Sequence, residues 1–278
     1  MNIISEIAYA KINLALHIRC RRDDGYHELD TLFAFLDDGD RLELTHATEF
    51  QLSFNGEFGG LIASEGIESN LVTRTARAVC AGELPRIKVA LTKNLPIAAG
   101  LGGGSADAAA MIRSLAKNAS LDIEGADINA IAAKLGADIP ACIQSVSVIG
   151  KGTGADLSPV PNDISGLSCV LINPRIALST ASVFKEWEGV DKGALPLGTA
   201  RDILENGRND LEAAAIKLCP QIAEILAYLK SSAPIIVRMS GSGATCFALY
   251  DDHQSAMRVS QGLMQSHPHW WQKTGRLR

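Results

Sequence analysis

The chain has 278 residues, a formal net charge of −5, and a composition that is 47% hydrophobic and 21% charged. This length suits one large or two ordinary domains of roughly 150 residues each. No apolar run reaches the roughly 18 residues that cross a bilayer, and no long basic block suggests a nucleic-acid partner. We therefore expect a soluble, cytoplasmic protein with neither membrane nor nucleic acid as a partner. The six cysteines form no C-x-x-C pair, so we expect buried thiols rather than disulfides or zinc ligands.

The first third of the chain predicts mainly strands. We expect these strands at 3–10, 14–19, 31–36, 41–45 and 50–54. A helix is expected to begin at a cap formed by Ser69 or Asn70 and to end before Gly82. A strand at 87–92 follows, and then a glycine loop opens a helix that runs to about residue 119.

The second half of the chain predicts helices and strands in alternation. Asp127 is expected to cap a helix that stops at Gly136, and Pro220 to open another. Strands are expected at 167–172, 235–239 and 244–250, with a last helix at 254–265. The segment 150–166 is rich in Gly, Pro and Asp and is the candidate domain boundary. The fold class predicted is α+β in two unequal halves, with domains at 1–155 and 156–278.

The run from Pro96 to Ala109, PIAAGLGGGSADAA, predicts a phosphate-binding loop. A strand, a glycine loop and a helix start together direct backbone N–H groups and a positive helix end at one point. A flexible turn is the alternative, but four glycines in five positions carry more entropic cost than a turn requires. The loop is not a Walker A element, because no Gly-Lys-Ser/Thr follows. It also fails the dinucleotide fingerprint, because Ser105 stands where the third glycine belongs.

Three other segments carry polar residues in apolar surroundings. Lys11 and Asn13 lie two residues apart in AYAKINLAL, hence on one face of a strand, and suggest the wall of a polar pocket. A lysine there is more often exposed at the strand surface. Asp138 in KLGADIPAC is, from its segment alone, a helix N-cap. The segment 240–243, SGSG, is either a tight hairpin or a loop that closes over a ligand.

Taken together, AYAKINLAL, GLGGGSADAA and MSGSGATCFAL resemble, in order, the three motifs of the galactokinase, homoserine kinase, mevalonate kinase and phosphomevalonate kinase (GHMP) superfamily. The element Asp24 to His27, DGYH, is similar to an element of one branch of this superfamily. That branch acts on 4-diphosphocytidyl-2-C-methyl-D-erythritol in the non-mevalonate isoprenoid pathway. The resemblance covers about residues 8–250. It implies a two-domain GHMP kinase fold, with a ribosomal protein S5 domain 2-like N-terminal domain and a ferredoxin-like C-terminal domain.

The resemblance also implies an activity, its cofactors and its site residues. The activity is transfer of the γ-phosphoryl group of ATP, with Mg²⁺, to the 2-hydroxyl of that cytidine-diphospho sugar alcohol. Catalytic roles fall on Lys11 and Asp138. The residues implied to bind ATP are Asn70, Lys93, Pro96, Gly100, Leu101, Gly102, Gly103, Gly104 and Ser105, with Asn70 and Lys93 lining the adenine pocket. Those implied to bind the substrate are Asn13, Tyr26, His27, Thr180 and Phe184, with Tyr26 and Phe184 sandwiching the cytosine.

No carboxylate cluster in the sequence demands a dedicated metal site, so we expect Mg²⁺ to be held by phosphate oxygens and water, with Ser105 as a candidate ligand. Two departures from the family stand out: Ala106 follows Ser105 where many relatives have a second hydroxyl residue, and the stretch after Asp138 lacks a common glycine. The alternatives are a sibling kinase for homoserine or mevalonate, a non-catalytic nucleotide-binding module, and a dinucleotide oxidoreductase. The pair Tyr26-His27 argues against the sibling, because those substrates have no base to stack.

Overall fold

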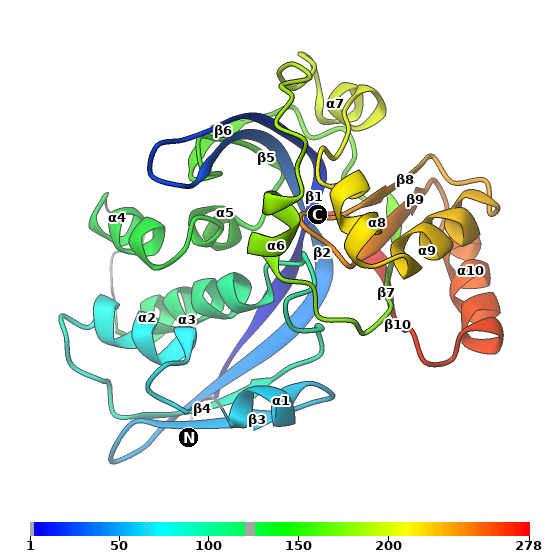
Figure 1. Ribbon diagram of the computed structural model, residues 1–278. Coiled ribbons are helices and arrows are strands. Elements are labelled where there is room, and N and C mark those ends of the chain that lie inside the picture. Colours follow the sequence, from blue (N-terminus) through cyan, green and yellow to red (C-terminus); the bar gives the residue numbers. More distant parts are fainter. Residues whose placement is uncertain (1–2, 65, 120–125) are drawn as a thin grey trace. The chain divides into compact units, whose positions relative to one another are not determined.

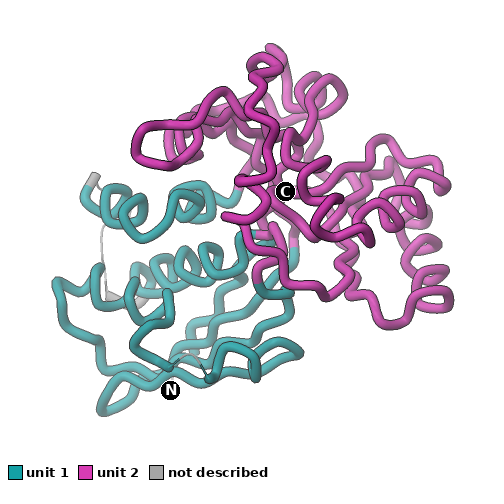
Figure 2. The backbone as a smooth tube through the Cα atoms, in the orientation of Figure 1, with its two compact units in different colours: residues 1–10, 38–97, 102–145 teal, residues 11–37, 98–101, 146–278 magenta. Residues whose placement is uncertain are grey.

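The computed structural model describes residues 3–64, 66–119 and 126–278, and its elements are labelled in Figure 1. The chain forms two compact units, each assembled from three separate segments (Figure 2). Unit 1 contains Met1–Ala10, Asp38–Ile97 and Gly102–Ser145, and unit 2 contains Lys11–Asp37, Ala98–Leu101 and Val146–Arg278. The assignment of 1–155 to ATP and 156–278 to substrate stays a prediction.

Unit 1 combines strands with a group of helices. Its elements are the first part of β1 (Ile4–Arg21), the second part of β2 (His27–His46), β3 (Gln51–Asn55), α1 (Gly59–Ala63), α2 (Leu71–Val79), β4 (Ile87–Thr92), α3 (Gly103–Ala119), α4 (Ala126–Leu135) and α5 (Ile139–Gln144). Strand β4 pairs in parallel with β3 and antiparallel with β2. Helix α3 packs against α2 and α5, and α4 packs against both of those helices (Figure 1).

Unit 2 contains a four-stranded antiparallel sheet in the order β10-β7-β9-β8. Its elements beyond the shared strands β1 and β2 are β5 (Val148–Lys151), β6 (Asp156–Pro159), β7 (Ser168–Asn173), α6 (Thr180–Lys185), α7 (Ala200–Asn206), α8 (Glu212–Leu218), α9 (Gln221–Lys230), β8 (Ile236–Met239), β9 (Cys246–Tyr250), α10 (His253–Ser266) and β10 (Trp271–Arg276). Helices α9 and α10 pack on this sheet.

The residues of α9 show why the sequence folds this way locally. Ile222, Ile225, Leu226 and Leu229 recur at helical spacing, and all four are buried in the core of unit 2. Burial of each such side chain contributes about 1.5–3 kcal/mol. Pro220 stands at the N-cap of α9. A backbone N–H at this position would have no acceptor within the helix, so a residue without an N–H costs no helical hydrogen bond. The predicted apolar face and helix start are therefore confirmed.

The structure corrects several expected elements. The strands expected at 3–10 and 14–19 are one strand, β1, and those expected at 31–36 and 41–45 are one strand, β2. The segment 150–166, the candidate domain boundary, contains β6 and the last two residues of β5, which pair antiparallel. Asp127 lies inside the first turn of α4 rather than at its cap. All six cysteines are free, as expected, and four of them are buried, although Cys20 is exposed.

Candidate active site

Three motifs that lie far apart in the sequence meet within unit 2. Lys11 Nζ donates a hydrogen bond to Asn13 Oδ1 at 2.7 Å, which confirms that the two side chains share one face. The backbone N–H of Asn13 donates to Ser240 Oγ at 3.0 Å. Ser240 Oγ in turn donates to the carbonyl of Gly100 at 2.8 Å. The strand motif, the glycine loop and the SGSG motif are thus joined by a chain of hydrogen bonds.

Gly100 occupies a position that only glycine accepts. Its φ is +75°, and a Cβ atom there would lie 2.3 Å from the carbonyl oxygen of Ser240. The SGSG segment does connect the paired strands β8 and β9, so the hairpin interpretation is correct as well. The backbone N–H of Lys11 donates to the carbonyl of Leu101 at 3.0 Å, which ties β1 to the same loop. The first half of the glycine loop is therefore held from two sides.

Lys11 is buried rather than exposed at the strand surface. Its exposed fraction is 5%, and its ammonium group lies 5.2 Å from the centre of the Phe33 ring. Asn13 is also buried, and its Nδ2 donates to Thr31 Oγ1 at 2.8 Å, which fixes the amide so that Oδ1 faces Lys11. A buried lysine whose ammonium is oriented by neighbours supports the interpretation of a polar pocket wall.

The second half of the glycine loop and Asp138 belong to unit 1. Gly103 begins α3, so the N–H groups of its first turn have no acceptor within the helix. Ser105 Oγ lies 3.7 Å from the position that a Cβ atom on Gly136 would take, which brings Ser105 beside the turn that leads into Asp138. Asp138 occupies the N-cap position of α5, but its side chain makes no capping hydrogen bond. A purely capping role for this carboxylate is thus not what the structure shows.

Helix α5, with Asp138 at its start, is held by Arg113 of α3. Arg113 Nη1 donates to the carbonyl of Cys142 at 2.8 Å, and Nη2 donates to the carbonyl of Ile7 in β1 at 2.7 Å. Its Nε donates to Glu6 Oε2 at 3.0 Å. One guanidinium therefore fixes α5 against the first part of β1, a role that no sequence motif indicated.

Two residues implied to line an adenine pocket also have structural roles. Asn70 caps α2, with its side chain accepting a hydrogen bond from the N–H of Val72 at 2.9 Å. The ammonium of Lys93 is buried and donates hydrogen bonds to the carboxyl groups of Asp40 and Asp107. Asp40 and Asp107 were missed by sequence reasoning. Contacts of Asn70 and Lys93 with adenine stay predictions.

The residues implied to hold the base, Tyr26, His27 and Phe184, all belong to unit 2. The Tyr26 side chain is 65% exposed on a turn, so it has no role in the core. His27 lies 4.7 Å from Phe184 between ring centres, at 33° between the planes, and Trp187 approaches the edge of His27 at 5.6 Å. Burial, and to a lesser degree the charge of Arg21, lowers the pKa of His27, so its ring is neutral at pH 7. A neutral imidazole can both donate and accept a hydrogen bond.

Thr180 lies beside the SGSG segment, with its Oγ1 2.9 Å from Ser242 Oγ. The sequence gave no signal for Trp187, whose indole Nε1 is buried and has no hydrogen-bond partner among the described residues. This tryptophan lies just after α6 and completes a cluster of three rings, His27, Phe184 and Trp187. The substrate-binding roles of Thr180, Phe184 and their neighbours stay predictions.

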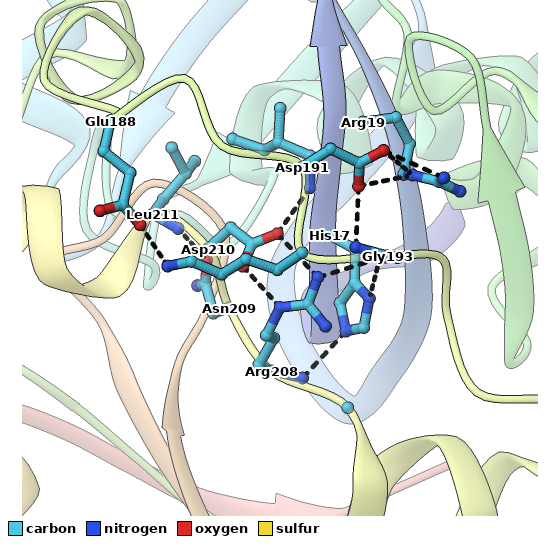
Figure 3. A network of polar contacts seen from close by, with 12 residues as sticks. His17, Arg19, Glu188, Asp191, Gly193, Arg208, Asn209, Asp210 and Leu211 are labelled. Atoms are coloured by element: carbon cyan, nitrogen blue, oxygen red, sulfur yellow. Dashed lines mark hydrogen bonds and ion pairs between the residues drawn. The ribbon is translucent and has the colours of Figure 1, made fainter.

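The loop that follows this ring cluster is anchored on β1 by a polar network (Figure 3). Arg19 Nε donates to Asp191 Oδ1 at 3.0 Å. The N–H of Arg208 donates to His17 Nε2 at 3.1 Å, so the proton of the imidazole is on Nδ1, which donates to the carbonyl of Gly193 at 3.1 Å. Burial, and then the charge of Arg208, lowers the pKa of His17. A neutral histidine therefore holds this loop at pH 7.

Within the described residues, no group of three or more His, Cys, Asp or Glu side chains is placed to hold a metal ion. None of the helices that the structure describes has the length and apolar character needed to cross a membrane.

Known proteins match this chain along its whole length. The family described as GHMP kinases N terminal domain matches residues 70–145, and GHMP kinases C terminal matches residues 196–268. A relative from Novosphingobium aromaticivorans, 4-diphosphocytidyl-2-C-methyl-D-erythritol kinase, is 51% identical over 99% of this chain and 93% of its own. The relative of the same name from Erythrobacter litoralis is 49% identical over 99% of this chain and all of its own.

Solved structures agree with these matches. A crystal structure of 4-(cytidine 5'-diphospho)-2C-methyl-D-erythritol kinase has a TM-score of 0.81 and 30% identity over 99% of both chains. Homoserine kinase from Cytophaga hutchinsonii has a TM-score of 0.69 at 16% identity, over 99% of this chain and 95% of its own, and shares the fold.

The chain belongs to the GHMP kinases, and the expected two-domain α+β fold of that superfamily is confirmed. It is an ATP-dependent small-molecule kinase. Within the superfamily it belongs to the 4-diphosphocytidyl-2-C-methyl-D-erythritol kinases.

Proposed function

We propose that this protein transfers the γ-phosphoryl group of ATP to the 2-hydroxyl of 4-diphosphocytidyl-2-C-methyl-D-erythritol, in the non-mevalonate route to isoprenoid precursors. The observation that carries the proposal is the 51% identity to a kinase of that name over 99% of the chain. The hydrogen-bonded chain from Lys11 through Asn13 and Ser240 to Gly100 supports it, because it unites the three motifs that the superfamily uses. The free cysteines support a reducing compartment, the cytoplasm.

Asp138 chiefly orients the attacking hydroxyl and accepts its proton late. Phosphoryl transfer passes through a loose transition state that needs little proton removal early in the reaction. A strong base is therefore not required, and a half-buried carboxylate at the start of α5 suffices. The ammonium group of Lys11 stabilises the negative charge that develops near the γ-phosphate.

The glycine loop holds the triphosphate through backbone N–H groups at the start of α3, where the helix end carries positive partial charge. Mg²⁺ is held by phosphate oxygens and water, and Ser105 is the hydroxyl beside the loop that fits as a protein ligand. When bound, the metal neutralises phosphate charge. The protein supplies the positions of the loop and of Ser105.

Recognition of the cytosine rests on Tyr26, His27 and Phe184. Aromatic faces on both sides of a base contribute roughly 1–3 kcal/mol each by stacking. The exposed Tyr26 is available for this role, and the neutral His27 presents one donor and one acceptor to a base edge. Asn13 and Thr180 contact the remainder of the substrate. A substrate without a base would leave these rings unused.

The proposal is tested by following ADP release from ATP and Mg²⁺ with three alcohols in parallel. Release that depends on the cytidine-diphospho compound supports the proposal, and mass spectrometry of the product locates the phosphate. Release stimulated by homoserine or mevalonate instead identifies a sibling kinase. Binding of ATP with no turnover on any alcohol identifies a non-catalytic nucleotide-binding module.

A further inference from the structure

Three ionisable side chains from three elements meet inside unit 1, next to the first turn of α3. Asp40 comes from β2, Lys93 directly follows β4, and Asp107 lies one turn into α3. Lys93 Nζ donates hydrogen bonds to both carboxyl groups, at 2.6 Å to Asp107 Oδ2. All three side chains are at most 5% exposed. Buried polar and ionisable groups of this kind are retained only when they form hydrogen bonds with one another.

We call Asp40, Lys93 and Asp107 the ion cluster. It forms hydrogen bonds with the backbone at the start of the glycine loop. Asp40 Oδ1 accepts hydrogen bonds from the backbone N–H groups of Asn94 at 2.5 Å and of Leu95 at 2.9 Å. These are the residues that lead from β4 into the loop. The entry to the loop is therefore fixed to β2 through a carboxylate.

The same cluster also forms a hydrogen bond with the helix that follows the loop. Asp107 belongs to α3 itself, so its bond to Lys93 ties the first turns of the helix to the end of β4. A Cβ atom on Gly103 would lie 3.4 Å from Lys93 Nζ and 3.6 Å from Asp40 Oδ2. The backbone of α3 thus begins within van der Waals reach of the ion cluster.

We propose that Asp40, Lys93 and Asp107 are positioning residues that hold both ends of the glycine loop in its phosphate-binding shape before the nucleotide arrives. This inference rests on the proposed function of the loop. A glycine-rich segment loses more conformational entropy on ordering than any other. Anchoring its two ends in the folded protein removes part of that loss from the binding step.

The proposal differs from a contact between Lys93 and adenine in what it predicts. An ammonium that binds the base affects only ligands that carry the base. An ammonium that shapes the loop affects every ligand that carries the phosphates, by the same factor. Inorganic tripolyphosphate, which has no base, separates the two roles.

The decisive experiment measures dissociation constants for ATP and for tripolyphosphate by calorimetry, in wild type and in two variants of one residue. Asp107→Ala removes the tie at a helical position flanked by alanines, so the helix tolerates it. It should weaken both ligands by the same factor of about ten, the loss of one hydrogen bond to a charged group. Asp107→Asn keeps an oxygen for Lys93 and should restore most of that affinity.

Lys93→Met and Lys88→Met form a matched pair, because both lysines belong to the same stretch and Lys88 is exposed on β4. Lys93→Met should weaken ATP and tripolyphosphate equally, and Lys88→Met should leave both unchanged. If Lys93→Met does not fold, as judged by circular dichroism, the two Asp107 variants decide alone.

If Lys93→Met weakens ATP binding and leaves tripolyphosphate binding unchanged, the proposal is overturned in favour of a contact between Lys93 and adenine. If Asp107→Ala binds both ligands as tightly as wild type, the proposal is overturned outright. These outcomes are separate from failure of the proposed function. If the wild-type protein binds both ligands but does not phosphorylate the cytidine compound, the proposed reaction is refuted. The positioning role is then still decided by the dissociation constants for ATP and tripolyphosphate.

Discussion

Replacing Asp107 with asparagine should stabilise this protein increasingly as the pH rises from about 4 to about 8. The ion cluster holds two carboxyl groups and one ammonium, so one carboxyl lacks a compensating charge. Asp40 accepts two backbone hydrogen bonds besides that of Lys93, whereas Asp107 Oδ1 is buried with no partner among the described residues. Burial, opposed by the charge of Lys93, raises the pKa of Asp107 to about 8. Asp107 is therefore the carboxyl that keeps its proton.

The direction and size of the effect follow from proton linkage. Between the unfolded pKa of about 4 and the folded value of about 8, the native state binds one proton more than the unfolded state. The free energy of unfolding therefore falls as the pH rises, by about 1.4 kcal/mol per pH unit while this difference is complete. The total reaches on the order of 5 kcal/mol near pH 8 and then levels off. Asparagine carries no titratable proton, so the free energy of unfolding of the variant does not include this pH-dependent decrease.

The assay is urea unfolding of wild type and Asp107→Asn at pH 5, 6, 7, 8 and 9, followed by circular dichroism. All other titrating groups are shared, so the difference between the two proteins isolates Asp107. We expect the variant to be the more stable one by a margin that grows up to pH 8. A constant margin across this range, or a wild type that gains on the variant as the pH rises, would show that Asp107 is ionised in the folded protein and refute the reasoning.

Four further predictions follow from the site. Asp138→Asn should lower the turnover number by about 10²- to 10⁴-fold, with the ATP dissociation constant unchanged; near-normal turnover would exclude its catalytic role. Gly100→Ala should lower the free energy of unfolding by about 2 kcal/mol or more in urea titrations, because its Cβ would lie 2.3 Å from the Ser240 carbonyl oxygen at a φ of +75°. Phe184→Ala should raise KM for the cytidine substrate by about tenfold or more and leave KM for ATP unchanged in steady-state assays; equal changes in both would argue against stacking. Because burial lowers the pKa of His17 from 6.5, the folded protein should lose stability as the pH falls below about 6.5, and His17→Gln should flatten that decline in the melting temperature.

Strong periodicity and glycine patterning made much of the fold predictable. Strand β4 has the predicted bounds, and α3 begins at the glycine loop as expected. Strands β1 and β2 were each divided in prediction, because Lys11 and the segment Asp37 to Asp40 interrupt their apolar pattern. Those polar residues are buried or paired in the folded chain, which a local pattern cannot show.

The candidate site was predictable only where a motif marks it. Lys11, Asn13, Gly100 and the SGSG segment were singled out by residue type and spacing, and the structure joins them. Asp107 gave no such signal, because a single aspartate in a helix of small residues resembles a solvent-facing position. Its partner Lys93 is 14 residues away, and Asp40 is 53 residues from Lys93. Their role depends on tertiary contacts that no spacing rule encodes.

The interleaving of the two units determines the order in which this chain can fold during synthesis. The second part of β1 belongs to unit 2, and its partners lie far downstream: Leu16 pairs with Arg208 and Asp210, and the carbonyl of Leu14 accepts from Arg238. Besides its pairing with β2, this strand acquires these partners only after about 200 further residues have left the ribosome. At roughly 5–20 residues per second, that leaves it without these partners for about 10–40 seconds.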